Sequence, residues 1–312
     1  MKKWIFVFIP LFLGIIFLFI LTPYPGEEGL ISPVLKINGN VGLNQWFPKQ
    51  VLGIFTNAPS VSANAAFFID TKSGNVLFAK NSKEKLPIAS LVKVMTVLIA
   101  LEHKSLDDQF LVSQRATEME PDEMILLPGE TLTLRELLDG IFLVSANDAA
   151  EVLAEGSVGT RDEFIQLMNE KAKQLGMKDT FYANPTGLDE DSGNSYSSAY
   201  DLAILTRFLI KQFPEVVDIS SVYHIYLPQT DTHQDYDMYS GINLLTTYPG
   251  VVGFKTGYTP EAGLTLVTLA RKNDSPRSAG GAGHEIIGVL LGSGDRRDEA
   301  RDLLDYSFGK LR

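Results

Sequence analysis

The stretch VVGFKTGYTPEAGLTLVTL, residues 251–269, predicts a strand, a turn and a second strand. Its apolar and β-branched residues favour extended structure. It also contains Lys255-Thr256-Gly257, a tripeptide that occurs once in the chain. A strand edge with a cation, a hydroxyl and a residue without a Cβ allows an anionic ligand to approach the backbone. The alternative is an ordinary strand end, with a lysine on the edge and a glycine at a bulge.

The segments around this stretch predict an antiparallel sheet interrupted by helices. Apolar runs at 66–70 and 76–79 flank a polar turn that contains Gly74, which is a hairpin pattern. Residues 286–291 predict a further strand and 299–308 a closing helix. Helical periodicity marks five intervening segments: 91–101, 132–144, 148–154, 161–175 and 198–213. We therefore expect an α/β (α+β) fold, in which the first and last strands share a sheet flanked by helices and an all-helical subdomain is inserted between them.

Composition excludes several classes of function. The 312 residues are 45% hydrophobic and 21% charged, which suits one large domain or two small ones. A net charge of −11 without a basic patch argues against nucleic acid as a partner. The chain has no cysteine, so disulfides and thiolate metal sites are excluded. Histidines are scattered and form no His-x-x-x-His pair, so we expect no metal: they are His103, His224, His233 and His284.

The N-terminus predicts a membrane-directed segment. Met1-Lys2-Lys3 precedes an apolar run at 4–21, long enough to cross a bilayer, with lysines that favour a cytoplasmic N-terminus. The exit from the run lacks an Ala-x-Ala-like site, which favours an uncleaved anchor over a cleaved signal peptide. Both interpretations place the rest of the chain outside the cytoplasm. We divide the chain into an anchor or signal segment (1–22), a linker (23–61) and a folded body (62–312).

Three Ser-x-x-Lys motifs occur, beginning at Ser82, Ser90 and Ser307, and context distinguishes the second. Ser90 opens an apolar helical segment, where residues i and i+3 share a face, so the Lys93 amine can reach the Ser90 hydroxyl. Free N–H groups at a helix N-terminus also favour developing negative charge. A lysine base needs a lowered pKa, which burial would supply. The alternative is that Ser90 simply caps the helix.

Ser-x-Asn occurs four times, beginning at Ser62, Ser73, Ser145 and Ser192. Only Ser145-Ala146-Asn147 lies between two helical segments, next to the apolar run 141–144. It is either a helix break capped by its own side chains or a polar site presented into a cleft.

Ser90–Lys93, Ser145–Asn147 and Lys255–Gly257 occur in the order known from penicillin-binding proteins and β-lactamases. Over about residues 62–312 the chain resembles the low-molecular-mass penicillin-binding proteins, the serine-type D-alanyl-D-alanine carboxypeptidases. Asn184-Pro185-Thr186-Gly187-Leu188 and the closing residues 288–292 are also similar to the family. The resemblance implies the penicillin-binding/β-lactamase-like transpeptidase fold.

The resemblance also implies a reaction. Ser90 would attack the carbonyl between the two terminal D-alanines of a peptidoglycan stem peptide, and Lys93 would take its proton. Ser145 and Asn147 would relay the proton and hold the substrate amide. Water would release the acyl-enzyme, without metal or organic cofactor, and β-lactams would acylate Ser90 as substrate mimics.

The family pattern assigns the strand motif to substrate binding. Lys255 and Thr256 would bind the terminal carboxylate, and Gly257 would admit the substrate backbone. The N–H groups of Ser90 and Tyr258 would form the oxyanion hole.

Departures from the family pattern leave several functions open. The chain stops directly after the closing helix, so the N-terminal run is expected to do the anchoring. The stretch 240–245 has fewer Asn and Arg residues than the family pattern leads us to expect, which weakens the case for carboxylate recognition. A β-lactamase would need a carboxylate to activate the deacylating water, but Glu163 and Asn169 have the wrong spacing. A non-catalytic penicillin- or wall-binding protein is disfavoured because all three motifs are present. An endopeptidase acting on cross-links is a substrate variant that the motifs do not separate from a carboxypeptidase.

Overall fold

The computed structural model describes residue 48 and residues 55–189, 193–272 and 283–311. The apolar run at 4–21 and most of the expected linker lie outside these residues. Within them, no helix is both long enough and apolar enough to cross a membrane.

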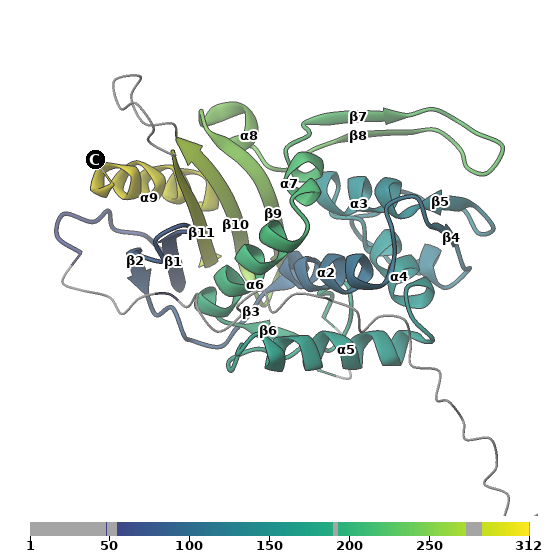
Figure 1. Ribbon diagram of the computed structural model, residues 1–312, viewed down its shortest axis with the longest axis horizontal. Helices are drawn as coiled ribbons and strands as arrows, with labels where there is room; N and C mark the ends of the chain where they lie inside the picture. The colour runs from purple at the N-terminus through teal and green to yellow at the C-terminus, as the bar shows by residue number, and fades with distance from the viewer. Residues whose placement is uncertain (1–47, 49–54, 190–192, 273–282, 312) are drawn as a thin grey trace, which may run out of the picture. The chain divides into compact units, whose positions relative to one another are not determined.

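A five-stranded antiparallel sheet forms one side of the molecule (Figure 1). The first and last strands of the chain are neighbours in it, with Phe67 opposite Val289. This confirms the expected shared sheet. The strands are, in sheet order, β2 (Val76–Lys80), β1 (Ala65–Asp70), β11 (His284–Ser293), β10 (Gly263–Lys272) and β9 (Val251–Thr259). The Lys-Thr-Gly motif therefore lies on an edge strand, and no other described strand pairs with its outer side.

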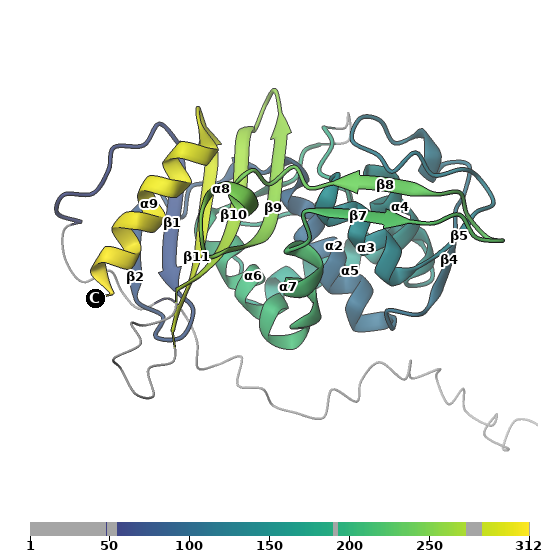
Figure 2. The same ribbon diagram turned by 90° about the horizontal axis from the view of Figure 1, so that it is seen from above.

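Helices cover both faces of this sheet, as Figure 2 shows. The closing helix α9 (Arg296–Lys310) packs on one face, where Phe68 joins a core with Leu303 and Phe308. On the other face, Phe67 joins the larger core of the helical part, which includes residues of α6 (Ala199–Gln212). Alternate residues of β1 thus face different cores, as the two-residue period of a strand requires.

The helical subdomain is built around α2 (Lys93–His103), in which every residue from Lys93 to Leu101 is buried. A helix buried on all sides holds its side chains in fixed positions, and α2 carries Lys93. The other helices are α3 (Leu134–Leu143), α4 (Asn147–Gly156), α5 (Arg161–Gln174) and α7 (Glu215–Ser220). The strands predicted at 251–254, 264–270 and 286–291, the hairpin and the closing helix are all confirmed.

Two predicted helix starts are wrong. The segment at 132 begins as strand β5 (Thr131–Thr133), and α3 starts after it because Thr133 and Glu136 form a capping box. The segment at 91 begins inside a 3₁₀ turn, η2 (Ala89–Val92), before α2. A hairpin was not predicted: it consists of β7 (His224–Leu227) and β8 (Tyr236–Tyr239). The remaining short elements are β3 (Leu86–Pro87), β4 (Gln109–Leu111), η3 (Ala116–Glu118), β6 (Tyr196–Ser197) and α8 (Leu244–Thr247).

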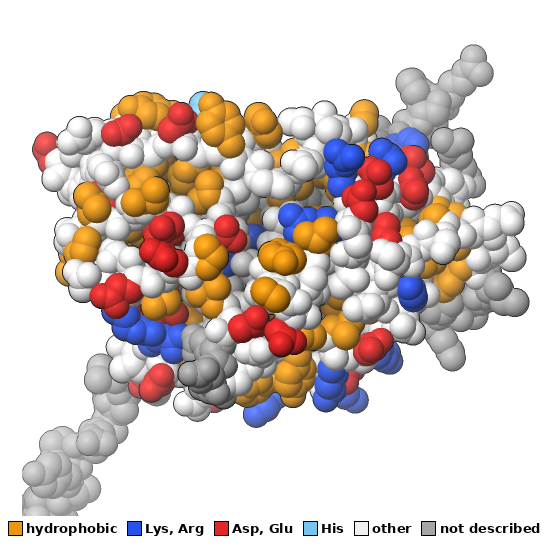
Figure 3. Space-filling model, turned by 180° about the vertical axis from the view of Figure 1, so that it is seen from behind, with side chains coloured by type: hydrophobic (Ala, Val, Ile, Leu, Met, Phe, Trp, Pro, Cys, Tyr) orange, Lys and Arg blue, Asp and Glu red, His pale blue; other side chains and the backbone are white. Residues whose placement is uncertain are grey.

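The face in Figure 3 carries acidic, basic and apolar side chains in small mixed groups. Among the described residues on this face, no broad basic surface of the kind used for nucleic acid is visible.

Candidate active site

Ser90 lies in η2, directly before the buried helix α2. The N-cap residue of this turn is Ile88, without a side-chain capping bond. The interpretation of Ser90 as a helix cap is therefore wrong. Its side chain instead faces the amine of Lys93, with Nζ 2.9 Å from Oγ.

Lys93 is completely buried, and its amine contacts three polar groups. Besides Ser90 Oγ, Nζ lies 2.6 Å from Asn147 Oδ1 and 2.7 Å from the carbonyl oxygen of Thr186. Burial holds the pKa of Lys93 well below its usual value, and the nearby charge of Lys255 lowers it further. The more distant carboxylates, among them Asp122, act in the opposite direction but do not outweigh burial.

A neutral Lys93 amine is compatible with these contacts, and the lowered pKa favours that form. The oxygens of Asn147 and Thr186 only accept hydrogen bonds, so each takes one N–H of the lysine. The hydroxyl of Ser90 can donate. A neutral amine has two N–H groups and one lone pair, so it satisfies all three neighbours with the lone pair directed at the Ser90 hydroxyl. This is the geometry of a general base acting on a serine nucleophile.

Ser145 and Asn147 form the turn between α3 and α4. Ser145 has a left-handed backbone (φ 64°), and the N-cap of α4 is Ala146, without a side-chain capping bond. The capping interpretation is wrong here too. Asn147 gives its oxygen to Lys93 and donates its Nδ2–H to the carbonyl of Pro121, so its amide has a fixed orientation. Both polar groups of Asn147 are engaged within the protein.

The edge strand β9 supplies the second lysine. Lys255 is 1% exposed, and its amine donates to Ser145 Oγ at 2.9 Å and to the carbonyl oxygen of Thr256 at 2.8 Å. Burial lowers the pKa of Lys255 to about 7; Asp122 opposes the shift and the Arg296 charge adds to it. Burial is thus the main reason that both lysines of the predicted motifs depart from their usual protonation.

Gly257 sets how closely β9 approaches the nucleophile. A Cβ at this position would lie 2.9 Å from the backbone nitrogen of Ser90 and 2.7 Å from Thr265 Oγ1. Only a residue without a side chain fits there. Tyr258 follows on the same strand, and it is 61% exposed at the surface.

Arg296 was not predicted as a site residue. It begins α9, donates to the carbonyl of Gly257 at 2.7 Å, and lines a small cleft together with Thr256 and Gly241. Its position had one signal in the sequence: a helix N-terminus disfavours cations, yet α9 starts with Arg296-Arg297. Arg296, far along the chain, thus supplies a basic side chain of the kind that the stretch 240–245 lacks.

The turn at 184–188 supports the nucleophile from the other side. Thr186 presents its carbonyl to Lys93, and Asn184 Oδ1 accepts three hydrogen bonds from the turn itself. Gly187 has φ 85°, and a Cβ there would lie 2.0 Å from the carbonyl oxygen of Ala89. The turn was matched to the family from its sequence, but its physical role became visible only in the fold.

Comparison with known proteins agrees with this geometry. Residues 54–279 match the Peptidase_S11 family, described as D-alanyl-D-alanine carboxypeptidase. The chain belongs to this family. It is 36% identical over 256 residues to D-alanyl-D-alanine carboxypeptidase DacF of Bacillus subtilis, covering 80% of this chain and 62% of the relative. It therefore spans less than two thirds of that relative's length.

Two solved structures show the same penicillin-binding fold. A D-alanyl-D-alanine carboxypeptidase from Mycobacterium tuberculosis is 31% identical with a TM-score of 0.71, covering 85% of this chain and 96% of that one. Penicillin-binding protein D2 from Listeria monocytogenes, in the cefotaxime-bound form, is 30% identical with a TM-score of 0.65, covering 80% of this chain and 98% of that one. The predicted fold class is confirmed.

Glu163 and Asn169, the two residues considered for a β-lactamase-type water site, have separate environments in the structure. Glu163 lies in the first turn of α5 and is exposed. The side chain of Asn169 bonds both backbone groups of Tyr182. Among the described residues, no group of three or more His, Asp or Glu side chains is arranged to hold a metal.

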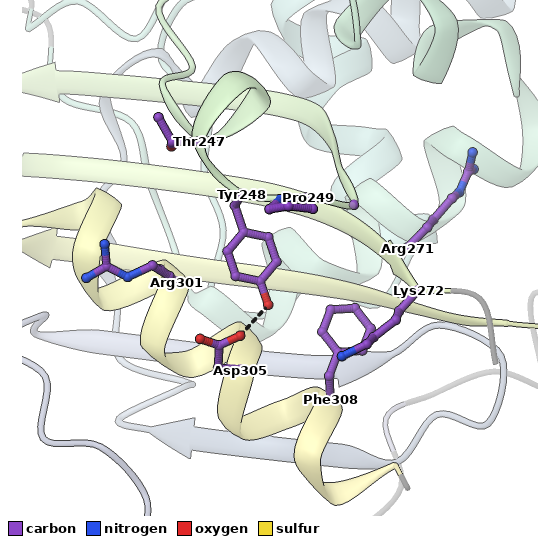
Figure 4. Close-up of a pocket in the computed structure, with 9 residues that line it drawn as sticks. Thr247, Tyr248, Pro249, Arg271, Lys272, Arg301, Asp305 and Phe308 are labelled. Atoms are coloured by element: carbon purple, nitrogen blue, oxygen red, sulfur yellow. Dashed lines mark hydrogen bonds between the residues drawn. The ribbon is translucent and has the colours of Figure 1, made fainter. Parts of the chain in front are cut away.

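A larger pocket of about 580 Å³ lies away from the candidate catalytic residues (Figure 4). It is formed by the segment before β9, the end of β10 and α9. Tyr248 donates to Asp305 across it, and Lys272 lies over the ring of Phe308. None of Ser90, Lys93 or Lys255 lines it, so it takes no part in the arrangement described above.

Proposed function

We propose that this protein is a serine-type D-alanyl-D-alanine carboxypeptidase that removes the terminal D-alanine from peptidoglycan stem peptides through a Ser90 acyl-enzyme. The observation that carries this proposal is the fully buried Lys93 amine, which lies 2.9 Å from Ser90 Oγ and is held by the acceptor oxygens of Asn147 and Thr186. Family membership supports the reaction, and the cefotaxime-bound relative supports β-lactams as inhibitors.

In the first step, Lys93 takes the hydroxyl proton as Ser90 Oγ attacks the carbonyl between the last two residues. The N–H groups of Ser90 and Tyr258 stabilise the oxyanion, a contribution typically worth a few kcal/mol per donor. The C–N bond then breaks, and the proton that Lys93 took from Ser90 passes to the leaving nitrogen through the Ser145 hydroxyl, which accepts it as it donates its own; Lys255 is bonded to Ser145. D-alanine leaves and Lys93 is again neutral.

Lys255, Thr256 and Arg296 bind the terminal carboxylate. Thr256 and Arg296 line a small cleft, where a carboxylate would find a hydroxyl and a charged donor, and the Lys255 amine lies on Ser145 Oγ next to Thr256 on the same strand. In the second step, Lys93 takes a proton from water, whose oxygen attacks the ester carbon. The C–O bond to Ser90 breaks and Oγ recovers the proton.

The β-lactamase alternative has less support, because Glu163 is exposed in the first turn of α5 and the Asn169 side chain is bonded to Tyr182. A non-catalytic binding protein would not require a neutral lysine beside the serine. Cross-link cleavage by the same residues remains a substrate variant.

The site of action is part of the proposal. The apolar run 4–21 acts as an uncleaved anchor that keeps the body outside the cytoplasm. Expression of the full chain should give membrane-bound protein with Met1 or its successor at the N-terminus, measured by fractionation and mass spectrometry. A mature protein that starts after residue 21 would instead support a cleaved signal.

Labelling with a fluorescent penicillin tests the function. Wild type should label and should release D-alanine from a peptide that ends in D-Ala-D-Ala, whereas Ser90→Ala should do neither. Ser82→Ala is the matched control, because Ser82 also belongs to a Ser-x-x-Lys motif but should retain both activities. Labelling of Ser90→Ala would overturn the nucleophile assignment. A wild type that labels but releases nothing would favour the binding-protein alternative, and rapid loss of label would favour a β-lactamase.

A further inference from the structure

Residues 121–126 form a strap that is bonded to two consecutive residues of the turn carrying Asn147. The backbone N–H of Asn147 donates to the carbonyl of Asp122 at 2.7 Å, and its side-chain Nδ2–H donates to the carbonyl of Pro121. The strap therefore determines how the Asn147 amide is oriented, and with it which atom of Asn147 faces Lys93.

The Asp148 side chain also binds the strap. Its carboxylate is fully buried in the first turn of α4 and accepts from the backbone of Met124 and of Leu126, each at 3.1 Å. A further bond comes from the N–H of Ala149 at 2.8 Å. Burial raises the pKa of Asp148, while these backbone bonds hold it down. A buried carboxylate that binds two N–H groups of a neighbouring segment fixes that segment in place.

The backbone of the strap is strained. Asp122 has φ 60° and Ile125 has φ 66°, a region that β-branched residues strongly disfavour. The Ile125 side chain is 65% exposed, so its burial does not offset the cost. Hydrogen bonds hold this conformation instead: Asp148 binds the residues on either side of Ile125, and the Gln234 side chain donates to the Ile125 carbonyl. Strain of this kind persists only where the surroundings impose it, and it is concentrated at functional sites.

We propose that Asp148 is a positioning residue for acyl transfer. Its carboxylate holds the strap so that the Pro121 carbonyl fixes the Asn147 amide, and Asn147 in turn fixes the amine of Lys93 against Ser90. This inference rests on the proposed function, since it assigns a role within the same reaction. In the sequence, Asp148 was only the start of a predicted helical segment.

The test separates reaction from folding by measuring penicillin acylation at saturation. Asp148→Asn keeps the shape but loses one acceptor, so the maximal acylation rate should fall about tenfold to a hundredfold. The dissociation constant of the non-covalent complex should change little. Asp201→Asn is the matched control: Asp201 is also buried and also accepts from a backbone N–H, that of Asp179, but it lies outside the site. It should lower the melting temperature and leave the acylation rate unchanged.

A second measurement repeats Asp148→Asn in an Asn147→Ala background. If Asp148 acts through Asn147, its substitution should cost less than about threefold there, because neighbours in one network are non-additive. An equal loss in both backgrounds would show a merely structural role and overturn the proposal. Gln234→Ala removes the side-chain bond to the Ile125 carbonyl, together with a contact to Tyr236, and should lower the rate by a smaller factor, even if Asp148→Asn does not fold. Unchanged rates in every folded variant would overturn the positioning role, whereas a wild type that is never acylated would overturn the proposed function itself.

Discussion

The helical side and the sheet side of the cleft each contribute one buried lysine, and the two lysines have different surroundings. Lys93, on the helical side, faces a serine hydroxyl and two carbonyl-type oxygens. Lys255, on the sheet side, donates to Ser145 and lies near the charge of Arg296. Burial lowers the pKa of both.

The difference shows that burial alone does not determine the chemical role of a lysine. Lys93 lies 2.9 Å from the hydroxyl of Ser90, the proposed nucleophile, so a lowered pKa would make it a base in the proposed reaction. Lys255 donates to Ser145 and is proposed to bind the substrate carboxylate, so the same effect would produce a cation whose charge depends on the ligand. Titratable groups whose surroundings differ in this way take different acid and base roles within one site.

Replacing the two lysines by methionine should separate their roles most strongly. Lys93→Met removes the base and should lower kcat by about a thousandfold, within the range for general-base catalysis. Lys255→Met should act mainly on KM. Steady-state kinetics with a D-Ala-D-Ala-ended peptide provide the measurement. Equal effects of both variants on kcat would remove the distinction drawn between the two sides.

Widening the distance between the two sides should be nearly as damaging. Gly257→Ala places a Cβ 2.9 Å from the Ser90 nitrogen, so β9 must move away from the oxyanion site. We expect penicillin acylation to slow by about tenfold to a hundredfold, as overpacking costs about 1–3 kcal/mol. Gly309→Ala is the control, because nothing lies within 4 Å of a Cβ there. Similar acylation by both alanine variants would contradict the close approach.

Lys255, on the sheet side, should make substrate binding depend on pH, whereas Lys93, on the helical side, should not. A bound carboxylate raises the pKa of Lys255 above its free value of about 7, so binding is strongest below pH 7 and weakens as the pH rises. The dissociation constant should increase about tenfold between about pH 6 and about pH 8 by linkage. Binding of a D-Ala-D-Ala-ended peptide to Ser90→Ala, measured by calorimetry, tests this. In Ser90→Ala/Lys255→Met the dependence should disappear, and its persistence would assign it to another group.

Arg296→Gln should have the smallest effect of the four. It removes one of the cations proposed for the carboxylate, and we expect KM to rise about threefold to tenfold with kcat within about a factor of two. Arg301→Gln, further along α9 and outside this cleft, should leave both constants unchanged. A fall in kcat without a change in KM would move Arg296 from substrate binding to the chemical step.

Much of the fold was predictable because its strands and main helices carry clear periodicity. The hairpin at 66–79 and the strands after 251 were correct for this reason. The β7–β8 hairpin was missed because its turn region, 228–235, has no glycine to mark it. The start of α3 was missed although Thr133 and Glu136 have capping-box spacing.

The candidate site was predictable where a motif is local and hidden where it depends on contacts between distant segments. The structure brings Ser90 and Lys93 together with Asn147, and Ser145 together with Lys255. Thr186 contacts Lys93 across 93 positions of sequence, and Arg296 reaches Gly257 across 39. Neither contact has a spacing rule, so neither could be found before the fold was known. The catalytic roles themselves remain predictions.

Measuring the protonation state of the Lys93 amine tests the central claim most directly. Nitrogen-15 NMR of the lysine side chains, assigned with Lys93→Met and Lys255→Met, would follow both titrations in the free enzyme. We predict that Lys255 titrates at about pH 7 and that Lys93 titrates well below its usual pKa of 10.5, with burial as the main cause for each. A Lys93 amine that titrates near its usual value would contradict the neutral base on which the mechanism depends.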